Sequence, residues 1–161
     1  MPNSAKNKVV RINDDALRQF TGYSMKRAFN AIQSDVTRTL APFGLRMITF
    51  SALAMISDNE GLSQSQLAAG LAIERPNLVV IIDELERRDL ISRERVPTDR
   101  RTYALQLTPE GVALLATASE ALLEHEARMM REVAPEDMAN MLAALRLIEN
   151  ANTKAETGRT G

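Results

Sequence analysis

The side chains best suited to ionic chemistry are six arginines gathered within residues 87–101. Three acidic residues lie among them, so the segment carries a surplus of three positive charges. A guanidinium is planar, stays ionised and donates in a fork that fits phosphate oxygens and the edge of guanine. A solvated charged helix face is the alternative, but these arginines flank two short alternating segments instead of one helix. The cluster favours contact with nucleic acid; it consists of Arg87, Arg88, Arg93, Arg95, Arg100 and Arg101.

A second polar group occupies residues 74–77. Arg75 and Asn77 flank Pro76, which suits the first position of a helix because it has no N–H to lose. Arginine can pair with guanine, and asparagine with adenine, through two hydrogen bonds each. Taken alone, both could be ordinary exposed residues at a helix start. Their position between a short capped helix and the arginine cluster favours base reading.

Other chemistries lack the residues they require. The 161-residue chain has no cysteine and a single histidine, His125, which excludes disulfides, thiolate nucleophiles and the usual zinc sites. No carboxylate pair, nucleophile–base pair or glycine-rich phosphate loop is evident, so we expect no enzyme, cofactor or metal. His125 stands between two glutamates, and we expect it on the surface.

The charge and hydropathy patterns restrict the partners. The net charge is −1, so a nucleic acid must be bound by a local basic patch and not by bulk charge. No apolar run approaches the roughly 20 residues needed to cross a bilayer. Residues 1–11 lack the apolar stretch of a signal peptide. We expect a cytoplasmic protein with no membrane partner.

Hydrophobic spacing predicts the helices of the first half. Apolar side chains at three- and four-residue steps over residues 13–40 predict one amphipathic helix of six or seven turns, and residues 47–57 predict a second, more apolar one. Ser63 and Gln66 have the spacing of a capping box, which begins a short helix. After a brief turn, residues 76–88 predict another helix.

The second half begins with a hairpin. Alternating apolar and polar residues predict strands over 90–96 and 102–107, joined by a turn at 97–99. Thr108 caps a long helix, and a last helix begins at Pro135. The predicted fold is mainly α with a small β-hairpin wing, the order of a winged helix-turn-helix. The helix after the turn then enters the major groove, with its N-terminal residues on base edges.

Residues 99–111, DRRTYALQLTPEG, resemble the wing signature of the MarR family of transcriptional regulators. That signature is Asp, any residue, Arg, three residues, Leu, any residue, Leu, Thr, two residues and Gly, and every fixed position is filled. Residues 83–90 are similar to the family's helix exit, with Asp89 where a glycine is usual. The resemblance covers about residues 14–150.

The physical roles of the wing residues stand beside this resemblance. Arg101 at the tip suits an A·T-rich minor groove, where negative potential is concentrated. Asp99 would direct its guanidinium through a bidentate pair, unless the two form only a solvated turn pair. Arg93, Arg95 and Arg100 suit phosphates, which position the protein without specifying sequence. The complete predicted DNA-binding set is Ser63, Gln64, Arg75, Pro76, Asn77, Arg93, Arg95, Asp99, Arg100 and Arg101.

The resemblance implies a homodimer, with the first helix and the last two packed across a two-fold axis. The terminal helices have more apolar face than one small winged unit can cover, although they could instead complete a monomeric bundle. A dimer sets two reading helices about one DNA turn apart, so we expect a pseudo-palindromic operator. The expected division is residues 1–45 and 109–152 for dimerisation, 46–108 for the winged DNA-binding unit, and 153–161 as a flexible tail.

The resemblance also implies release from double-stranded DNA when a small molecule enters a pocket between the dimerisation region and the winged unit. We expect a repressor whose effector is an aromatic carboxylate or its coenzyme A thioester. A constitutive or architectural DNA-binding protein without an effector is the alternative, and a helical protein-interaction module is a further one. The candidate effector-binding residues combine apolar bulk with a cation on the first two helices: Tyr23, Arg27, Arg46, Met47 and Phe50.

Overall fold

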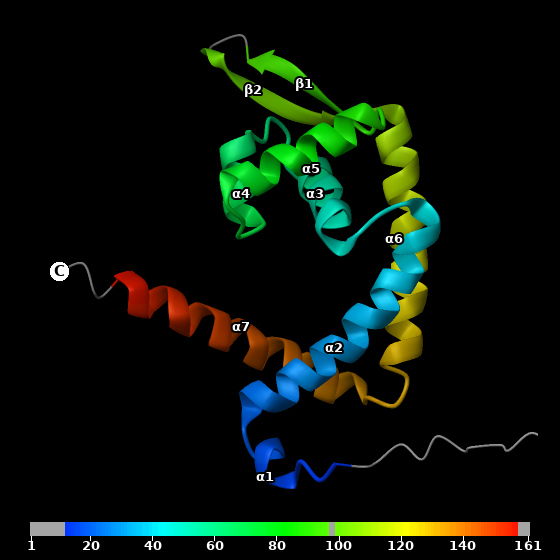
Figure 1. The fold of residues 1–161 in the computed structure, drawn as a ribbon, viewed down its shortest axis with the longest axis vertical. Helices are drawn as coiled ribbons and strands as arrows, with labels where there is room; N and C mark the ends of the chain where they lie inside the picture. The colour runs from blue at the N-terminus through cyan, green and yellow to red at the C-terminus, as the bar shows by residue number, and fades with distance from the viewer. Residues whose placement is uncertain (1–11, 97–98, 158–161) are drawn as a thin grey trace, which may run out of the picture.

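A winged unit forms one end of the molecule, and a long terminal helix extends from the other end (Figure 1). The structure, a computed structural model, describes residues 12–96 and 99–157, with the backbone alone at 96, 99–102 and 152–157. Helices α2 (Thr21–Leu40) and α6 (Pro109–Met129) pack together and connect the two ends. The predicted fold class is confirmed, because the chain is mainly helical with one two-stranded antiparallel sheet among the described residues.

The other elements follow the predicted order. After α2 come the short 3-10 helix η1 (Ala41–Phe43), α3 (Met47–Asp58), α4 (Gln64–Gly70) and α5 (Arg75–Arg87). The wing strands are β1 (Ile91–Val96) and β2 (Asp99–Leu107), and α7 (Pro135–Thr157) is the last helix. Of the turn predicted at residues 97–99, Pro97 and Thr98 lie outside the described residues, and Asp99 already belongs to β2.

The single helix predicted over residues 13–40 is wrong, because the chain bends before α2. A one-turn helix, α1 (Asp15–Arg18), is followed by Phe20 in extended conformation. The next two residues, threonine and glycine, are weak helix formers, so little is lost by breaking the helix there. The hydroxyl of Tyr23 donates to the Asp14 carboxylate at 2.7 Å, which ties the two sides of the bend together.

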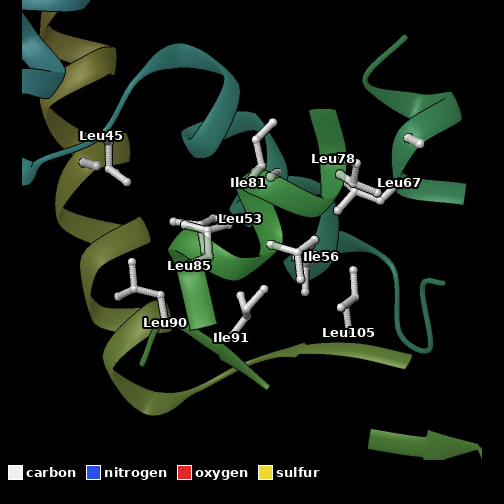
Figure 2. Packing of buried hydrophobic residues seen from close by; sticks show 14 of the residues in the cluster. Leu45, Leu53, Ile56, Leu67, Leu78, Ile81, Leu85, Leu90, Ile91 and Leu105 are labelled. Atoms are coloured by element: carbon white, nitrogen blue, oxygen red, sulfur yellow. The ribbon is translucent and has the colours of Figure 1, made fainter. Parts of the chain in front are cut away.

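The hydrophobic core lies within the winged unit and extends to the helices beside it. In Figure 2, leucine and isoleucine side chains from α3, α5, β1 and β2 point into one cluster. Val36 and Leu40 of α2 and Ala118 of α6 belong to the same cluster. Burying one such large apolar side chain stabilises the fold by about 1.5–3 kcal/mol. The core therefore joins the winged unit to the connecting helices α2 and α6.

The turn after α5 is left-handed at the residue where the family resemblance lacks its glycine. Asp89 has a φ of 55°. Its N–H donates to the carbonyl of Glu86 at 2.8 Å, and the N–H of Leu90 donates to the carbonyl of Leu85 at 3.0 Å. These two bonds define the Schellman end of a helix. Aspartate is enriched among the non-glycine residues that adopt this conformation. The departure from glycine thus leaves the turn geometry intact.

The beginning of α6 is joined to this same turn. The Thr108 hydroxyl caps α6 by accepting from the N–H of Gly111 at 3.0 Å, and it donates to the carbonyl of Asp89 at 2.6 Å. The N–H of Thr108 donates to the carbonyl of Leu90 at 3.1 Å. A Cβ atom on Gly111 would stand 2.0 Å from the Leu90 carbonyl oxygen. The signature's threonine and glycine therefore allow the start of α6 to touch the turn at the end of α5.

Replacing Gly111 with alanine should destabilise the protein by about 2–4 kcal/mol, because the added methyl group meets backbone that has no rotamer to change. Gly22→Ala is the matched control, since a Cβ there meets nothing within 4 Å and alanine favours the helix. Urea unfolding followed by circular dichroism checks both. Equal stabilities for Gly111→Ala and the wild type would contradict the contact.

Apolar side chains remain exposed on the helices outside the winged unit. Phe20 and Phe29 are exposed near the beginning of the chain, and Met141, Leu142 and Ile148 are exposed along α7. No element among the described residues of the same chain covers this surface. No single described helix is long and apolar enough to cross a membrane; α2 with η1 and α3 meets the length and composition test only as a pair bent by 71°.

The expectation of a surface His125 is wrong. Its side chain is 2% exposed, and its Nδ1 lies 2.7 Å from a carboxylate oxygen of Asp35 on α2. Arg128, one helical turn further along α6, donates to the same oxygen at 2.8 Å. The two glutamates beside His125 in sequence face solvent, but the helical period turns the histidine itself inward. This cluster links α2 to α6 across about 90 residues of sequence.

The Asp35 cluster predicts a pH dependence of stability. Hydrogen bonds from Arg128 and His125 lower the pKa of Asp35 from 3.8 to about 2. A carboxylate whose pKa is lowered by folding stabilises the fold at any pH above its pKa in the unfolded chain. This contribution is lost as the pH falls from about 4 through 2. Asp35→Asn should therefore lower the urea midpoint at pH 7, with the difference from wild type shrinking below pH 4. A difference that stays constant from pH 7 to 2.5 would be inconsistent with this.

Candidate nucleic-acid interface

The helix-turn-helix begins with a well-formed cap. The hydroxyl of Ser63 accepts from the N–H of Gln66 at 3.3 Å, and the Gln66 side chain accepts from the N–H of Ser63 at 2.9 Å. This is the predicted capping box at the start of α4. Gln64 is the first helical residue, and it is partly exposed with Ser63. Both side chains thus lie at the positive end of the α4 dipole.

The turn between α4 and α5 sets the direction of α5. Ala72 has a φ of 52°, an uncommon conformation for alanine. Its N–H donates to the carbonyl of Ala69 at 3.1 Å, and that of Ile73 donates to the carbonyl of Ala68 at 3.0 Å. The chain then turns sharply, and α5 begins after Glu74 in extended conformation.

The predicted base-reading residues form the exposed first turn of α5. Arg75, Pro76 and Asn77 are all exposed, with Pro76 second in the helix and not first as predicted. Four apolar side chains, Leu78, Ile81, Ile82 and Leu85, face the core. The helical period therefore directs the first turn and one complete side of α5 away from the protein.

Two exposed valines on α5 escaped the sequence analysis. Val79 is 47% exposed and Val80 is 65% exposed, beside the first turn. An apolar run such as 78–82 does not by itself reveal which members face outward. The available signal was helical spacing: 78, 81, 82 and 85 form one face, which leaves 79 and 80 outside it. Exposed apolar side chains on a reading helix suit the methyl group of thymine.

The wing is attached to the start of α4 as well as to α5. β1 pairs with β2 in antiparallel register, with Arg95 opposite Tyr103 and Ile91 opposite Leu107. A further isolated bridge joins Ser63 to Ala104, and the N–H of Leu105 donates to the carbonyl of Leu62 at 2.9 Å. Leu105 is buried, so the returning strand is anchored to the core.

The arginines of the wing fall into different situations. The guanidinium of Arg93 pairs through Nη2 with Asp83 and Glu86 of α5, both at 2.7 Å, which attaches the wing to α5. Arg95 is exposed on the same strand. The side chains of Asp99, Arg100 and Arg101 lie outside the described residues, although their backbone belongs to β2. The expected Asp99–Arg101 pair therefore stays a prediction.

The five candidate effector residues are separated within one chain. Arg46, Met47 and Phe50 lie together at the start of α3, where Arg46 pairs with Glu84 of α5 and Phe50 packs against the core. Tyr23 and Arg27 lie near the start of α2. Tyr23 precedes the end of that 20-residue helix by 17 positions, or about 25 Å at 1.5 Å per residue.

Comparison with known proteins agrees with this geometry. Residues 43–102 match the sequence profile of the MarR family. A putative transcriptional regulatory protein for the hcr operon of Thauera aromatica is 30% identical over 126 residues, which span 78% of this chain and 76% of that protein. The chain belongs to the MarR family. The wing signature at residues 99–111 and the fold around it are those of MarR-type transcriptional regulators.

Solved structures support the same assignment. The transcriptional repressor CouR bound to a 23-mer DNA duplex superposes with a TM-score of 0.82 at 34% identity, over 86% of this chain and 99% of that one. CouR bound to p-coumaroyl-CoA gives 0.77 at 32% identity, over 86% and 98%. CouR of Rhodococcus jostii RHA1, also bound to p-coumaroyl-CoA, gives 0.76 at 28% identity, over 83% and 94%.

Proposed function

We propose that this MarR-family protein is a homodimeric repressor that binds a pseudo-palindromic DNA operator and releases it when an aromatic acyl-CoA thioester binds. The observation that carries the DNA part is the exposed first turn of α5, which carries Arg75 and Asn77. The structural likeness to CouR on a DNA duplex supports it.

The base-reading residues on α5 are Arg75 and Asn77, with Val79 and Val80 as apolar contacts. Arginine donates two hydrogen bonds to guanine, and asparagine both donates to and accepts from adenine. The two valines suit the methyl group of thymine. Pro76, the second residue of the helix, stands between the two polar side chains and fixes the backbone φ at that position. This group supplies the sequence specificity.

The remaining predicted residues supply affinity. Ser63 and Gln64 present the N-terminus of α4 to a DNA phosphate. Arg95 and Arg100 contact other phosphates of the DNA backbone from the wing. Arg101, directed by Asp99, enters the minor groove. Because Arg93 is held by two carboxylates of α5, we assign it to positioning the wing and not to a phosphate.

The dimer covers the apolar surface of the terminal helices. Exposed side chains of α1, α2 and α7, including Leu17, Phe20 and Leu145, would be buried against their two-fold copies. Residues 1–45 and 109–152 thus form the dimerisation region, and the winged unit at 46–108 projects from it. A two-fold axis gives two reading helices for two half-sites.

The effector is an aromatic acyl-CoA thioester, supported by the 32% identity to CouR bound to p-coumaroyl-CoA over most of both chains. Arg46, Met47 and Phe50 line one side of the pocket at the start of α3. Tyr23 and Arg27 lie near the other end of α2, about 25 Å from Leu40 at 1.5 Å per residue, so within one chain they lie apart from these three residues. In this arrangement the pocket lies where the dimerisation helices meet the winged unit.

Single substitutions separate base reading from phosphate binding. Operator sequences are first selected from a randomised duplex pool. Arg75→Ala and Asn77→Ala should then reduce the preference for the selected sequence by about 1–3 kcal/mol. Arg95→Ala should weaken binding evenly across sequences and reduce the salt slope by about one. Mobility shifts at several salt concentrations measure both effects. The same pattern in all three variants would mean that α5 is not the reading helix.

The effector is tested on the same protein–DNA complex. p-Coumaroyl-CoA should release the duplex and raise the thermal midpoint of the free protein, because a ligand that binds only the folded state stabilises it. Coenzyme A alone is the control for the nucleotide portion. If a panel of aromatic acids and their thioesters leaves both the complex and the thermal midpoint unchanged, the constitutive DNA-binding alternative is favoured.

A further inference from the structure

The end of the reading helix is attached to the segment that joins α2 to α3. We call residues 41–46 the elbow. Arg88, immediately after α5, donates from Nη1 to the carbonyl of Gly44 at 2.7 Å and from Nη2 to the carbonyl of Phe43 at 2.9 Å. These partners lie 44 and 45 residues away in sequence. One guanidinium therefore connects α5 to the point where the chain leaves α2.

The elbow is shaped to receive this side chain. Gly44 has a φ of +62°, and a Cβ there would stand 3.4 Å from Nη2 of Arg88. The N–H of Gly44 donates to the carbonyl of Ala41 at 2.9 Å, and that of Leu45 donates to the carbonyl of Leu40 at 3.3 Å. The Phe43 and Gly44 carbonyls stand at the C-terminal end of α2 and η1, where the helix dipole favours a cation.

A second contact connects the same two elements. Arg46, the last residue of the elbow, pairs with Glu84 of α5. Arg46 is 60% exposed and Glu84 is 25% exposed, so solvent screens this ion pair and it contributes little to stability. Arg88 instead makes two directional bonds to fixed backbone atoms. Apolar contacts around them are non-directional and tolerate small rotations, whereas a bidentate guanidinium does not.

We infer that Arg88 is a positioning residue that sets the angle of the reading helix relative to α2, and through it the half-site spacing that the dimer accepts. This inference rests on the proposed function. If α2 belongs to the dimerisation region and α5 reads DNA, the elbow is the joint between them. The two hydrogen bonds from Arg88 to the elbow then fix the separation of the two α5 helices in the dimer.

The test measures spacing preference and not affinity alone. Wild type, Arg88→Met and Arg88→Lys are assayed on the selected operator and on versions with one or two base pairs inserted at its centre. One inserted pair moves a half-site by about 3.4 Å. The wild type should lose at least about tenfold in affinity per insertion, and Arg88→Met less than about threefold. Arg88→Lys should fall between them, because an ammonium cannot reproduce the fork. Arg87→Gln, which removes the neighbouring exposed charge, should keep the wild-type profile.

The outcomes separate the inference from the function on which it rests. If no duplex is selected by the wild type, the proposed function fails. If the wild type binds a duplex but Arg88→Met loses the same factor on every spacing, Arg88 only stabilises the fold and the inference is overturned. Urea unfolding of each variant confirms that the assayed protein is folded.

Discussion

The close approach of Gly111 to the carbonyl of Leu90 constrains most of the fold. A hydrogen atom is the only substituent that fits there, and the Thr108 hydroxyl bonds to both helices at the same point. Three elements meet at this contact: the end of α5, the start of β1 and the start of α6. The direction of the wing and the direction of the connecting helix therefore cannot change independently. Backbone packing therefore defines how the start of α6 meets the end of α5.

Some arginines around α5 bond to other groups of the protein, and others are exposed to solvent. Arg88 donates to two backbone carbonyls, and Nη2 of Arg93 pairs with two carboxylates. Arg75 and Arg95 are both exposed, and Arg75 lies in the first turn of α5 while Arg95 lies on β1. A local excess of positive charge thus does not measure the charge offered to a ligand. The partners of each guanidinium must be known before it can be assigned to DNA.

The sequence predicted the elements and the winged order because apolar spacing and caps are local signals. The Ser63–Gln66 box and the Thr108 cap are present as expected, and the wing signature led to the correct family. The failures are contacts between distant segments. His125 was expected on the surface because its sequence neighbours are glutamates, but its partner Asp35 is 90 residues away. The break before α2 depends on Tyr23 reaching Asp14, and the two roles of the arginines depend on partners that no local pattern reveals.

Two corners of the helix-turn-helix, at Ala72 and Asp89, hold left-handed backbone without glycine. The left-handed conformation at each position lowers the stability of the native state by about 1 kcal/mol relative to glycine. The reading unit is therefore not at its stability optimum, and both positions offer simple compensating changes. Substitutions that alter operator preference on α5 and weaken folding could be rescued there, far from any base. The number of destabilising substitutions that such a helix can accept is limited by the free energy of unfolding. Glycine at these two positions would increase that free energy.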